Sequence, residues 1–551
     1  MKTRTLIKIV IYLAFILDCN IIFAQIKCAT DEVMKKNTLL LQQISRNNAI
    51  YQKNRLSVNT LEEIPDNVTV YTVPVVFHIY HLGEAVGVGS NASLASVQNA
   101  LLGMNNAFRA QAEYTGVSPD VRIQFVLAAR TPTCGATDGI VRVDGRAVAG
   151  YEANGLAYGD DVAEAAFRAL SSWPNSQYVN IRIFHDITGT GGYAYFLNDI
   201  FMPVNSLTLA NSDFWAHEMG HSFNLYHTFE GDRDNSNNAI CPINNNPATD
   251  GDLITDTDPH KREAACNTMA LNECTNTAFG NVVSNIMSYS CGLLFTANQV
   301  YRMRYALLNY RKSLIFSSGG LPPAAGNLPT MACIPTAPNG LSPYFGISNF
   351  SLANIFYNGT SPEYTGANYE NLTCLSQTNL QVGVATSFQL VSTYGNTARA
   401  KIFIDYNNDG DFEDMNEQVY NSSTWLVTHN GSITPPATAN LKTFLRLRIM
   451  MDGTNMTACN LPGGIEDGSG MAVDFAVKIL PVNCIQMQTV KSGNWNDPTI
   501  WSCGRIPLST DNVTIANTDI VTVPMGVFHV KNINLIGTIR YLVGGELRLN
   551  Q

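Results

Sequence analysis

Three histidines stand close together in the segment HEMGHSFNLYH, which runs from His217 to His227. Because His217 and His221 are four residues apart, a helix places them on one face, where they can bind the same metal ion. His227 can reach that ion only if the helix ends first. Asn224 is placed to end it, because asparagine tolerates the left-handed conformation better than most residues. Three imidazoles and one open position are typical of a catalytic zinc site.

Glu218 follows the first of these histidines and is the expected general base. Zinc lowers the pKa of a bound water, and a neighbouring carboxylate can take its proton and later deliver it to a leaving amine. The competing interpretation is an amphipathic helix with two ordinary core histidines. A third histidine at this spacing argues against that interpretation.

The segments around this motif predict the elements that must hold it. Residues 73–81, 122–128 and 179–185 are apolar or alternating runs that predict strands, while residues 96–109 and 161–170 have the spacing or composition of helices. Strands that alternate with helices predict an α/β domain.

The composition of the whole chain is typical of extracellular proteins rich in β-structure. Of its 551 residues only 14% are charged, and the net charge is −10. This acidic balance, without a dense cluster of Lys and Arg, argues against nucleic acid or an anionic membrane as the main partner.

The N-terminus predicts a signal peptide. Three basic residues precede an apolar run from Ile9 to Leu17, and Ala24 offers a small residue for cleavage, so residues 1–24 are expected to be removed. No later segment is long and apolar enough to span a bilayer. We therefore expect a secreted, extracellular protein without a membrane span.

Beyond these local patterns, HEMGHSFNLYHTFEG resembles the zinc site of the pappalysin/ulilysin (cytophagalysin) family of metzincin peptidases. Asn224 stands where most metzincins have glycine. The segments GDLITDTDP (251–259), NIMSYSC (285–291) and FTANQVYRM (295–303) are also similar to segments of that family and occur in its order. The resemblance covers roughly residues 28–315.

The resemblance implies further site residues. Met287 is expected beneath the zinc histidines as a hydrophobic floor, and Tyr289 is expected to donate a hydrogen bond to the tetrahedral intermediate. From the sequence alone, ordinary core packing explains both residues equally well. An edge strand is expected to pair with an extended protein substrate, and its residues are Gly192, Tyr193, Ala194 and Tyr195.

A structural calcium ion is another implication of the resemblance. Asp252, Thr255 and Thr257 offer the hard oxygen ligands that calcium prefers. The alternative is a turn rich in Asp and Thr that binds no ion.

The family pattern also pairs the four cysteines after the helix, first with third and second with fourth. It implies the disulfides Cys241–Cys274 and Cys266–Cys291, which would tie the loops to the segment around Met287. The sequence alone permits three connectivities.

Cys28, in the segment KCATDE, is the expected latency residue. Twelve cysteines become eleven when Cys19 leaves with the signal peptide, so at least one is unpaired. A thiolate can fill the zinc position that the catalytic water needs, and the resemblance implies such a cysteine in the pro-segment. The alternative is a disulfide, for example with Cys134. Cleavage at Lys53 or Arg55 is expected to activate the enzyme.

The C-terminal half predicts β modules. One segment begins like an EF-hand loop, but its twelfth position is Asn416, where a bidentate Glu belongs, and a hairpin turn explains it equally well. The residues that give this pattern are Asp405, Asn407, Asp409 and Gly410. Together with residues 463–477, the segment resembles the GEVED-type β-sandwich of secreted bacterial enzymes. That resemblance implies adhesion or docking to a surface or matrix.

These patterns together predict a multidomain protein with an α/β metzincin-type zinc peptidase domain, a β-sandwich and a small all-β or solenoid-like C-terminal module. The expected ranges are signal peptide 1–24, pro-segment 25–68, catalytic domain 69–318, linker 319–332, GEVED-like sandwich 333–481 and C-terminal module 482–551.

The expected function is that of a secreted zinc metalloendopeptidase, made as a latent zymogen, that hydrolyses peptide bonds in proteins. The alternatives are a cell-surface or matrix adhesin with a degenerate peptidase scaffold, and a zinc hydrolase with a non-protein substrate. The intact Glu218 speaks against a degenerate scaffold, because an inactive protein has no need of the general base.

Overall fold

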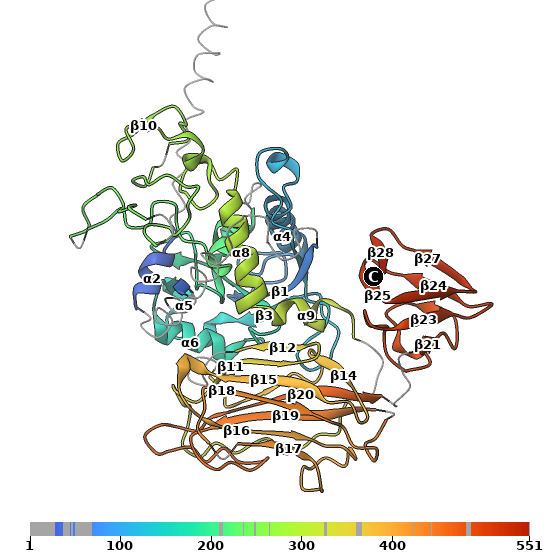
Figure 1. Ribbon diagram of the computed structural model, residues 1–551. Coiled ribbons are helices and arrows are strands. Elements are labelled where there is room, and N and C mark those ends of the chain that lie inside the picture. Colours follow the sequence, from blue (N-terminus) through green and yellow to red (C-terminus); the bar gives the residue numbers. More distant parts are fainter. Residues whose placement is uncertain are drawn as a thin grey trace, which may run out of the picture. The chain divides into compact units, whose positions relative to one another are not determined.

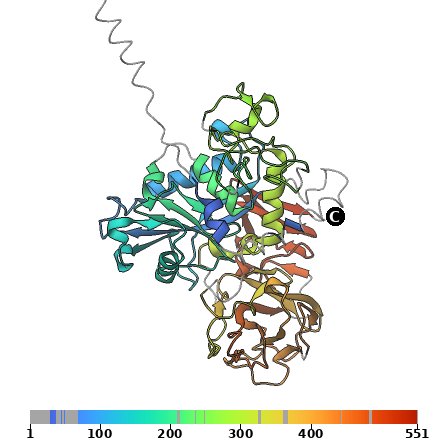
Figure 2. The same cartoon turned by 90° about the vertical axis from the view of Figure 1, so that its left-hand side faces the viewer.

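The structure is a computed structural model (Figures 1 and 2). By its internal contacts the chain divides into two compact units. The first contains residues 1–128 and 138–311, and the second contains residues 129–137 and 312–551. The predicted signal peptide and the predicted activation sites lie outside the described residues. The described residues are 28–36, 45, 48–49, 69–208, 213–234, 236–246, 249–263, 265–323, 328–359, 366–422, 424–441, 443–480 and 486–549.

A mostly parallel sheet forms the core of the first unit. Its strands are β1 (Tyr71–His81), β2 (Ile123–Leu127), β3 (Ile140–Asp144), β5 (Val179–Phe184), β7 (Tyr193–Ala194) and β8 (Ile200–Pro203). They lie in the order β2-β1-β5-β8-β7, and β3 pairs with the C-terminal part of β1. β1 and β5 are almost continuously buried, as expected of parallel strands covered on both faces. β7 runs antiparallel to β8 at the edge of the sheet.

Helices accompany this sheet, and side chains cap several of them. They include α2 (Thr30–Lys36), α4 (Leu94–Phe108), α5 (Tyr151–Asn154), α6 (Asp161–Leu170), α7 (Asp213–Ser222) and α8 (Ala297–Tyr310). Ser93 caps α4, Asp160 caps α6, and Thr296 forms a capping box with Gln299 at the start of α8. The predicted strands and helices of this unit agree with the observed bounds within two residues.

A β-sandwich makes up much of the second unit. One sheet has the order β12-β11-β15-β18, and the other has the order β13-β20-β19-β16-β17 with β14 beside β20. Phe350 of the first sheet stacks on Phe475 of the second, so the two sheets share a core. The strands are β11 (Ile347–Leu352), β12 (Ile355–Asn358), β13 (Tyr369–Asn371), β14 (Gln377–Gln381), β15 (Thr386–Ser392), β16 (Arg399–Ile404), β17 (Gln418–Asn421), β18 (Thr428–Ile433), β19 (Phe444–Asp452) and β20 (Met471–Leu480).

The boundary between the units differs from the predicted one, because residues 129–137 belong to the second unit. A disulfide joins Cys134 to Cys374 of the sandwich. The Arg130 guanidinium donates to the carbonyl of Cys374 at 2.9 Å and to that of Pro322 at 2.6 Å. This loop is therefore fastened to the sandwich, although the sequence placed it in the catalytic domain.

The predicted linker also begins inside the second unit. The Gly319 carbonyl accepts the N–H groups of Ala129 and Arg130 at 2.9 and 3.1 Å. The Pro/Gly-rich start of this segment is therefore held by hydrogen bonds. The composition of a segment cannot reveal such partners, because they come from distant parts of the chain.

The last 64 described residues form short parallel ladders, which matches the solenoid-like alternative. Successive turns of the chain stack β21-β23-β26, β22-β24-β27 and β25-β28. Trp495 and Trp501 pack edge to face in the core of this module. The strands are β21 (Gln486–Gln488), β22 (Gly493–Asn494), β23 (Asn512–Ile515), β24 (Ile520–Val523), β25 (Gly526–Val530), β26 (Asn532–Leu535), β27 (Thr538–Tyr541) and β28 (Gly545–Leu549).

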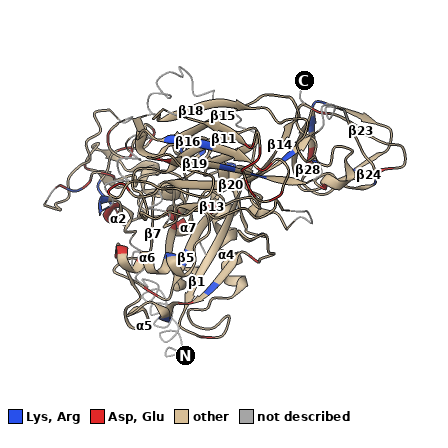
Figure 3. Ribbon diagram, turned by 90° about the horizontal axis from the view of Figure 1, so that it is seen from below, with Lys and Arg blue, Asp and Glu red and all other residues tan. Residues whose placement is uncertain are grey.

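The cysteines fit an oxidising compartment. Both disulfides implied by the resemblance, Cys241–Cys274 and Cys266–Cys291, are present, and Cys333 pairs with Cys459. Among the cysteines that the structure describes, Cys28 alone has a free thiol, so the alternative of a Cys28–Cys134 bridge is wrong. Lys, Arg, Asp and Glu residues are sparse along the ribbon in Figure 3. Within the described residues, we find no helix with the length and hydrophobicity of a membrane span.

Candidate metal centre and active site

α7 carries the first two histidines and ends at the predicted asparagine. Asn224 has φ 73°, in the left-handed region. Its N–H donates to the carbonyl of His221 at 2.8 Å, and the N–H of Leu225 donates to that of Gly220 at 3.0 Å. This pair of bonds is the Schellman arrangement, which reverses the chain at the end of a helix. The reversal brings His227 back toward the helix.

The Nε2 atoms of the three histidines converge. His217 Nε2 lies 3.2 Å from those of His221 and His227, and the last two are 3.1 Å apart. All three side chains are buried. Around a tetrahedral ion with bonds of about 2.0–2.1 Å, nitrogen ligands are about 3.3 Å from one another. The spacing therefore fits a tetrahedral metal ion.

The opposite ring nitrogens determine the tautomers. Nδ1 of His217 lies 2.7 Å from the carbonyl oxygen of Ile286, and Nδ1 of His221 lies 2.7 Å from that of Leu225. A carbonyl only accepts, so both Nδ1 atoms carry the proton and both Nε2 atoms present a lone pair. Nδ1 of His227 lies 2.8 Å from the Asp31 carboxylate.

Three lone pairs at this distance repel one another unless a cation lies among them. Protonation does not relieve the repulsion. Burial and the charge of His227 lower the pKa of His217 to about 3, and burial with the neighbouring imidazoles lowers the pKa of His221 well below its ordinary value. Neutral imidazoles oriented by acceptors on Nδ1 are the usual ligand set of a catalytic metal ion, so the residues fit such an ion.

Glu218 is fully buried next to this cluster. The Thr30 hydroxyl lies 3.1 Å from the Cys28 sulfur and donates to Oε2 of Glu218 at 3.4 Å, so the carboxylate is close to the sulfur. Oε1 of Glu218 has no hydrogen-bond partner among the described residues. Burial raises the pKa of Glu218 to about 8. A carboxyl with a raised pKa is suited to hold a proton in transit.

Met287 lies against Gly220 of α7. A Cβ atom added to Gly220 would lie 2.5 Å from the Met287 sulfur, so the glycine makes room for the methionine. Asn285 accepts the Met287 N–H at 2.9 Å and forms two hydrogen bonds with the side chain of Gln299 on α8. The turn that carries Met287 is thereby fixed to α8.

Tyr289 lies beside the histidines. Its ring centroid is 5.9 Å from that of His217 and 5.1 Å from that of His227. Its hydroxyl donates to the carbonyl of Cys28 at 2.8 Å. A hydroxyl in this place can donate to another carbonyl once Cys28 is absent.

Cys28 brings a sulfur atom to the three histidines. Its Sγ is 3.6 Å from Nε2 of His221. Sulfur and nitrogen ligands of one tetrahedral zinc ion are about 3.5 Å apart. The thiol and the three imidazoles together form a group with the spacing of metal ligands. Burial, and after it the Glu218 carboxylate, raises the pKa of Cys28 well above its ordinary value, so a thiolate at this position requires a cation.

The segment around Cys28 runs along the edge of the sheet. Cys28 pairs with Gly192 in a parallel bridge, and the N–H of Ala29 donates to the Gly192 carbonyl at 3.1 Å. The N–H of Ala194 donates to the Thr30 hydroxyl at 3.0 Å. Gly192 and Ala194 belong to the predicted substrate strand, so the N-terminal segment occupies the edge where a substrate is expected to pair.

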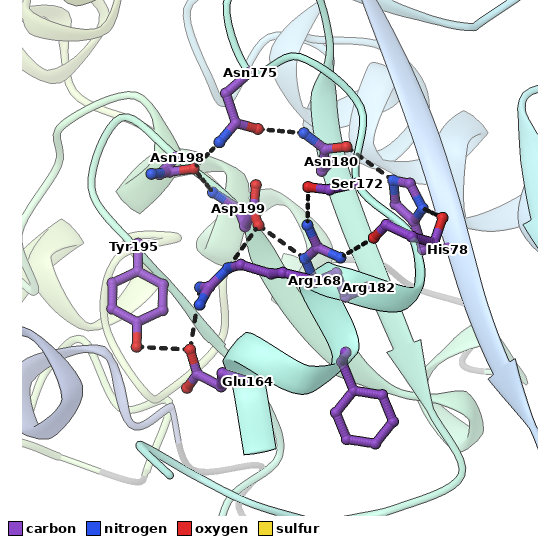
Figure 4. A network of polar contacts seen from close by, with 12 residues as sticks. His78, Glu164, Arg168, Ser172, Asn175, Asn180, Arg182, Tyr195, Asn198 and Asp199 are labelled. Carbon is purple, nitrogen blue, oxygen red and sulfur yellow. Dashed lines mark hydrogen bonds and ion pairs between the residues drawn. The ribbon is translucent and has the colours of Figure 1, made fainter. Parts of the chain in front are cut away.

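A buried network of charges lies behind that strand (Figure 4). Glu164 on α6 accepts the hydroxyl protons of Tyr193 at 2.6 Å and Tyr195 at 2.9 Å. Arg168 lies 3.1 Å from the same carboxylate and 3.4 Å from Asp199, which also pairs with Arg182 at 2.8 Å. The network fixes both tyrosines of the predicted substrate strand to α6.

The predicted calcium ligands are only partly together. The Thr257 hydroxyl donates to Asp252 at 2.7 Å, and both residues line a small cavity. The Thr255 hydroxyl instead accepts a hydrogen bond from Asn298 at 2.8 Å. Burial raises the pKa of Asp252 to about 7. Calcium binding in this loop stays a prediction.

The sequence did not single out Thr30, Asp31 or Glu164. Thr30 and Asp31 follow Cys28 closely in the sequence. Their side-chain oxygen atoms, near a possible metal ligand, were the only feature that could have pointed to a role in the site. Glu164 has no such signal, because its partners come from elements far away in the chain.

Comparisons with known proteins agree with this site. Residues 162–308 match the family model described as pregnancy-associated plasma protein-A, and residues 399–478 match the GEVED domain model. An extracellular metalloprotease of Colletotrichum graminicola is 30% identical over 149 residues, which cover 25% of this chain and 49% of that protein. The chain thus spans about half the length of this curated relative.

Two solved structures are also similar. A promirolysin variant from Tannerella forsythia is 20% identical with a TM-score of 0.41, and the match covers 54% of this chain and 98% of that one. Mature mirolysin from the same organism, in complex with a cleaved peptide, is 21% identical with a TM-score of 0.34, and the match covers 45% and 98%. By the family models, residues 162–308 resemble the peptidase domain of the pregnancy-associated plasma protein-A family, and residues 399–478 resemble a GEVED domain.

Proposed function

We propose that this chain is a secreted zinc-dependent metalloendopeptidase that its N-terminal segment holds latent. The observation that carries the proposal is the convergence of three Nε2 lone pairs beside a buried glutamate. The peptidase family match and the extracellular relative support it.

The metal ion is assigned to His217, His221 and His227, and we infer zinc because neutral imidazoles in a tetrahedral arrangement suit it. A zinc ion held by these three imidazoles would supply Lewis-acid chemistry, which would lower the pKa of water and polarise the carbonyl of a peptide bond. Glu218 takes the proton of the attacking water and delivers it to the leaving amine. Tyr289 donates a hydrogen bond to the carbonyl oxygen as it becomes negative.

The substrates are proteins or peptides that bind in an extended conformation. β7 offers a free sheet edge to such a chain once the N-terminal segment has left, and Tyr193 and Ala194 provide its backbone groups. We further propose that the GEVED domain serves docking to a surface or matrix, and that Asp252 and its neighbours bind a structural calcium ion.

Casein hydrolysis with and without a chelator tests the activity. The processed protein should cleave casein, lose this activity with the chelator and regain it with zinc. Glu152→Ala, at an exposed glutamate, is the control for Glu218→Ala. A folded, zinc-loaded and processed protein that cleaves no protein substrate would leave the adhesin as the better reading. Hydrolysis of small esters without peptides would favour a non-protein substrate.

Latency is proposed to arise from Cys28 as the fourth metal ligand. Support comes from its sulfur at 3.6 Å from His221 Nε2 and from its carbonyl, which accepts the Tyr289 hydroxyl proton. Thr30 at the same time covers Glu218. The segment therefore blocks the metal position, the general base and the hydrogen-bond donor together.

Replacing the metal by cobalt distinguishes latency caused by a Cys28–metal bond from latency caused only by coverage of the site. The unprocessed cobalt protein should show a thiolate-to-metal charge-transfer band, and Cys28→Ala should remove the band and raise activity without processing. The proposal is wrong if Cys28→Ala remains as latent as the wild type, or if peptide mapping finds Cys28 in a disulfide.

A further inference from the structure

The hairpin loop between β16 and β17 of the sandwich collects carboxylates that lack a cationic partner. Asp409, Asp411 and Asp414 place carboxylate oxygens within 4.8 Å of one another. Asp405 and Glu417 lie at the two ends of the loop, and both are buried. In the described part of the chain, no Lys or Arg forms an ion pair with any of the five.

The start of the loop has the geometry of a calcium-binding loop. Asp405 accepts the backbone N–H of Asp409 at 3.2 Å and that of Gly410 at 3.0 Å. Gly410 has φ 98°, which the sharp turn at the sixth position of such a loop requires. The alternating Asp, Asn and Asp residues therefore have the backbone conformation found at the start of a calcium-binding loop.

The end of the loop supplies the acid that the twelfth position lacks. Asn416 adopts φ 75°, in the left-handed region, so the chain turns directly before Glu417. Oε1 of Glu417 accepts the N–H of Tyr406 at 2.8 Å. Oε2 is buried and has no hydrogen-bond partner among the described residues. A buried carboxylate oxygen without a partner is costly, so it calls for a ligand.

The carboxyl group of Glu417 lies at the start of the loop, where it accepts the Tyr406 N–H. Burial raises the pKa of Glu417 to about 7, and the charge of Asp405 adds to the rise. The negative charges of Glu417 and Asp405 therefore disfavour each other. A divalent cation between them would reverse this repulsion.

The side chain of Asn407 lies between the carboxylates of Asp409 and Asp414. Its amide nitrogen donates to Asp409 at 2.8 Å and to Asp414. The amide thus places a partial positive charge between two carboxylates. Rotation of the side chain would present the amide oxygen to a cation at the same place.

We propose that this loop binds a calcium ion through Asp405, Asn407, Asp409, Asp414 and Glu417. Carboxylate and amide oxygens in a flexible loop are the ligands that calcium prefers, and the loop replaces the usual twelfth-position glutamate by one at the thirteenth position. The site is independent of the peptidase chemistry.

The ion would also stabilise the segment that precedes the sandwich. The N–H of Thr330 donates to the side chain of Asn408 at 3.0 Å, and the Thr330 hydroxyl donates to the Asn408 carbonyl at 3.0 Å. A cation that orders the loop therefore also orders its contact with Thr330.

Thermal unfolding of the full chain tests the proposal, with Glu218→Ala as background to prevent self-digestion. Extracellular calcium modules have a Kd of about 10⁻⁴–10⁻³ M, so about 10 mM calcium should raise the Tm of the sandwich transition by roughly 3–10 °C. Magnesium at equal ionic strength should raise it much less, because magnesium demands a more regular octahedral site.

Two variants and one matched control decide the outcome. Glu417→Gln and the exposed Asp409→Asn should each lose most of the calcium-dependent shift, whereas Glu466→Gln, at an exposed glutamate of the same sandwich, should keep it. Asp409→Asn keeps the test valid if Glu417→Gln fails to fold. An equal calcium shift in all variants, or an equal shift with magnesium, would overturn the proposal.

Discussion

Asp31 accepts the Nδ1 proton of His227 at 2.8 Å, although 196 residues separate the two in the chain. His217 and His221 use backbone carbonyls of their own domain for the same purpose. The third histidine therefore depends on a residue that leaves if the N-terminal segment is removed. Glu230 lies in the same cluster, within 4.8 Å, and its Oε2 has no partner among the residues described. We expect Glu230 to accept the His227 proton in the processed enzyme.

Replacement of Asp31 should weaken latency without changing the processed enzyme. Asp31→Ala removes the acceptor that joins the segment to His227, so the unprocessed protein should show a higher basal activity. After processing, wild type and variant should have the same kcat, because the substituted residue is no longer present. Casein assays before and after processing measure both. Glu32→Ala on the same helix is the control, and equal latency in the two variants would contradict the role of Asp31.

Glu230→Gln should affect the processed enzyme more than the unprocessed protein. Loss of the carboxylate that orients a metal-bound histidine typically lowers metal affinity by about 10–100-fold. We expect this loss in the processed enzyme and a smaller one in the zymogen, where Asp31 provides the acceptor. Zinc competition with a chromophoric chelator measures it. An equal loss in both forms would show that Glu230 does not replace Asp31.

The general base and a metal ligand should fail in different ways. Glu218→Ala should keep zinc and the fold and lose about 10²–10⁴-fold in kcat, because only the proton transfer is removed. His221→Ala should lose the metal itself. Zinc content by mass spectrometry, measured beside casein hydrolysis, distinguishes the two. If Glu218→Ala cleaved casein at a near wild-type rate, the assignment of Glu218 as general base would be wrong.

The local part of the site could be predicted because it depends on short-range geometry. Four residues of helix align His217 with His221, and one left-handed residue, Asn224, returns the chain to His227. The strands and helices around them were predictable for the same reason, since hydrophobic periodicity is local.

The remaining features depend on contacts between distant segments. The disulfide between Cys134 and Cys374 spans 240 residues, and it places residues 129–137 with the sandwich instead of the peptidase domain. Cysteine count alone permits many pairings. Glu164 likewise looked like an ordinary helix residue, because the two tyrosines it holds are about thirty positions away.

The absence of a side chain at Gly220 should be a requirement of the metal centre. Gly220→Ala places a Cβ 2.5 Å from the sulfur of Met287, which is fully buried, so one of the two side chains must shift. Overpacking of this kind costs about 1–3 kcal/mol, more than the gain of up to about 1 kcal/mol in helix propensity. We expect a lower Tm and weaker zinc binding. In the double variant with Met287→Ala, the total loss should be smaller than the sum of the single losses.

The charge of Glu164 should control substrate binding through the edge strand. Glu164→Gln keeps the shape of the side chain but removes its ion pair with Arg168 and weakens the bonds from the Tyr193 and Tyr195 hydroxyls. The strand would then be held less firmly against α6, while the histidines and the general base stay in place. We expect KM for an extended peptide to rise about 3–10-fold with kcat nearly unchanged, as when binding common to ground state and transition state is lost. Glu152→Gln, at an exposed glutamate, should leave both parameters unchanged. A fall in kcat without a change in KM would show that Glu164 acts on the catalytic centre and not on the strand.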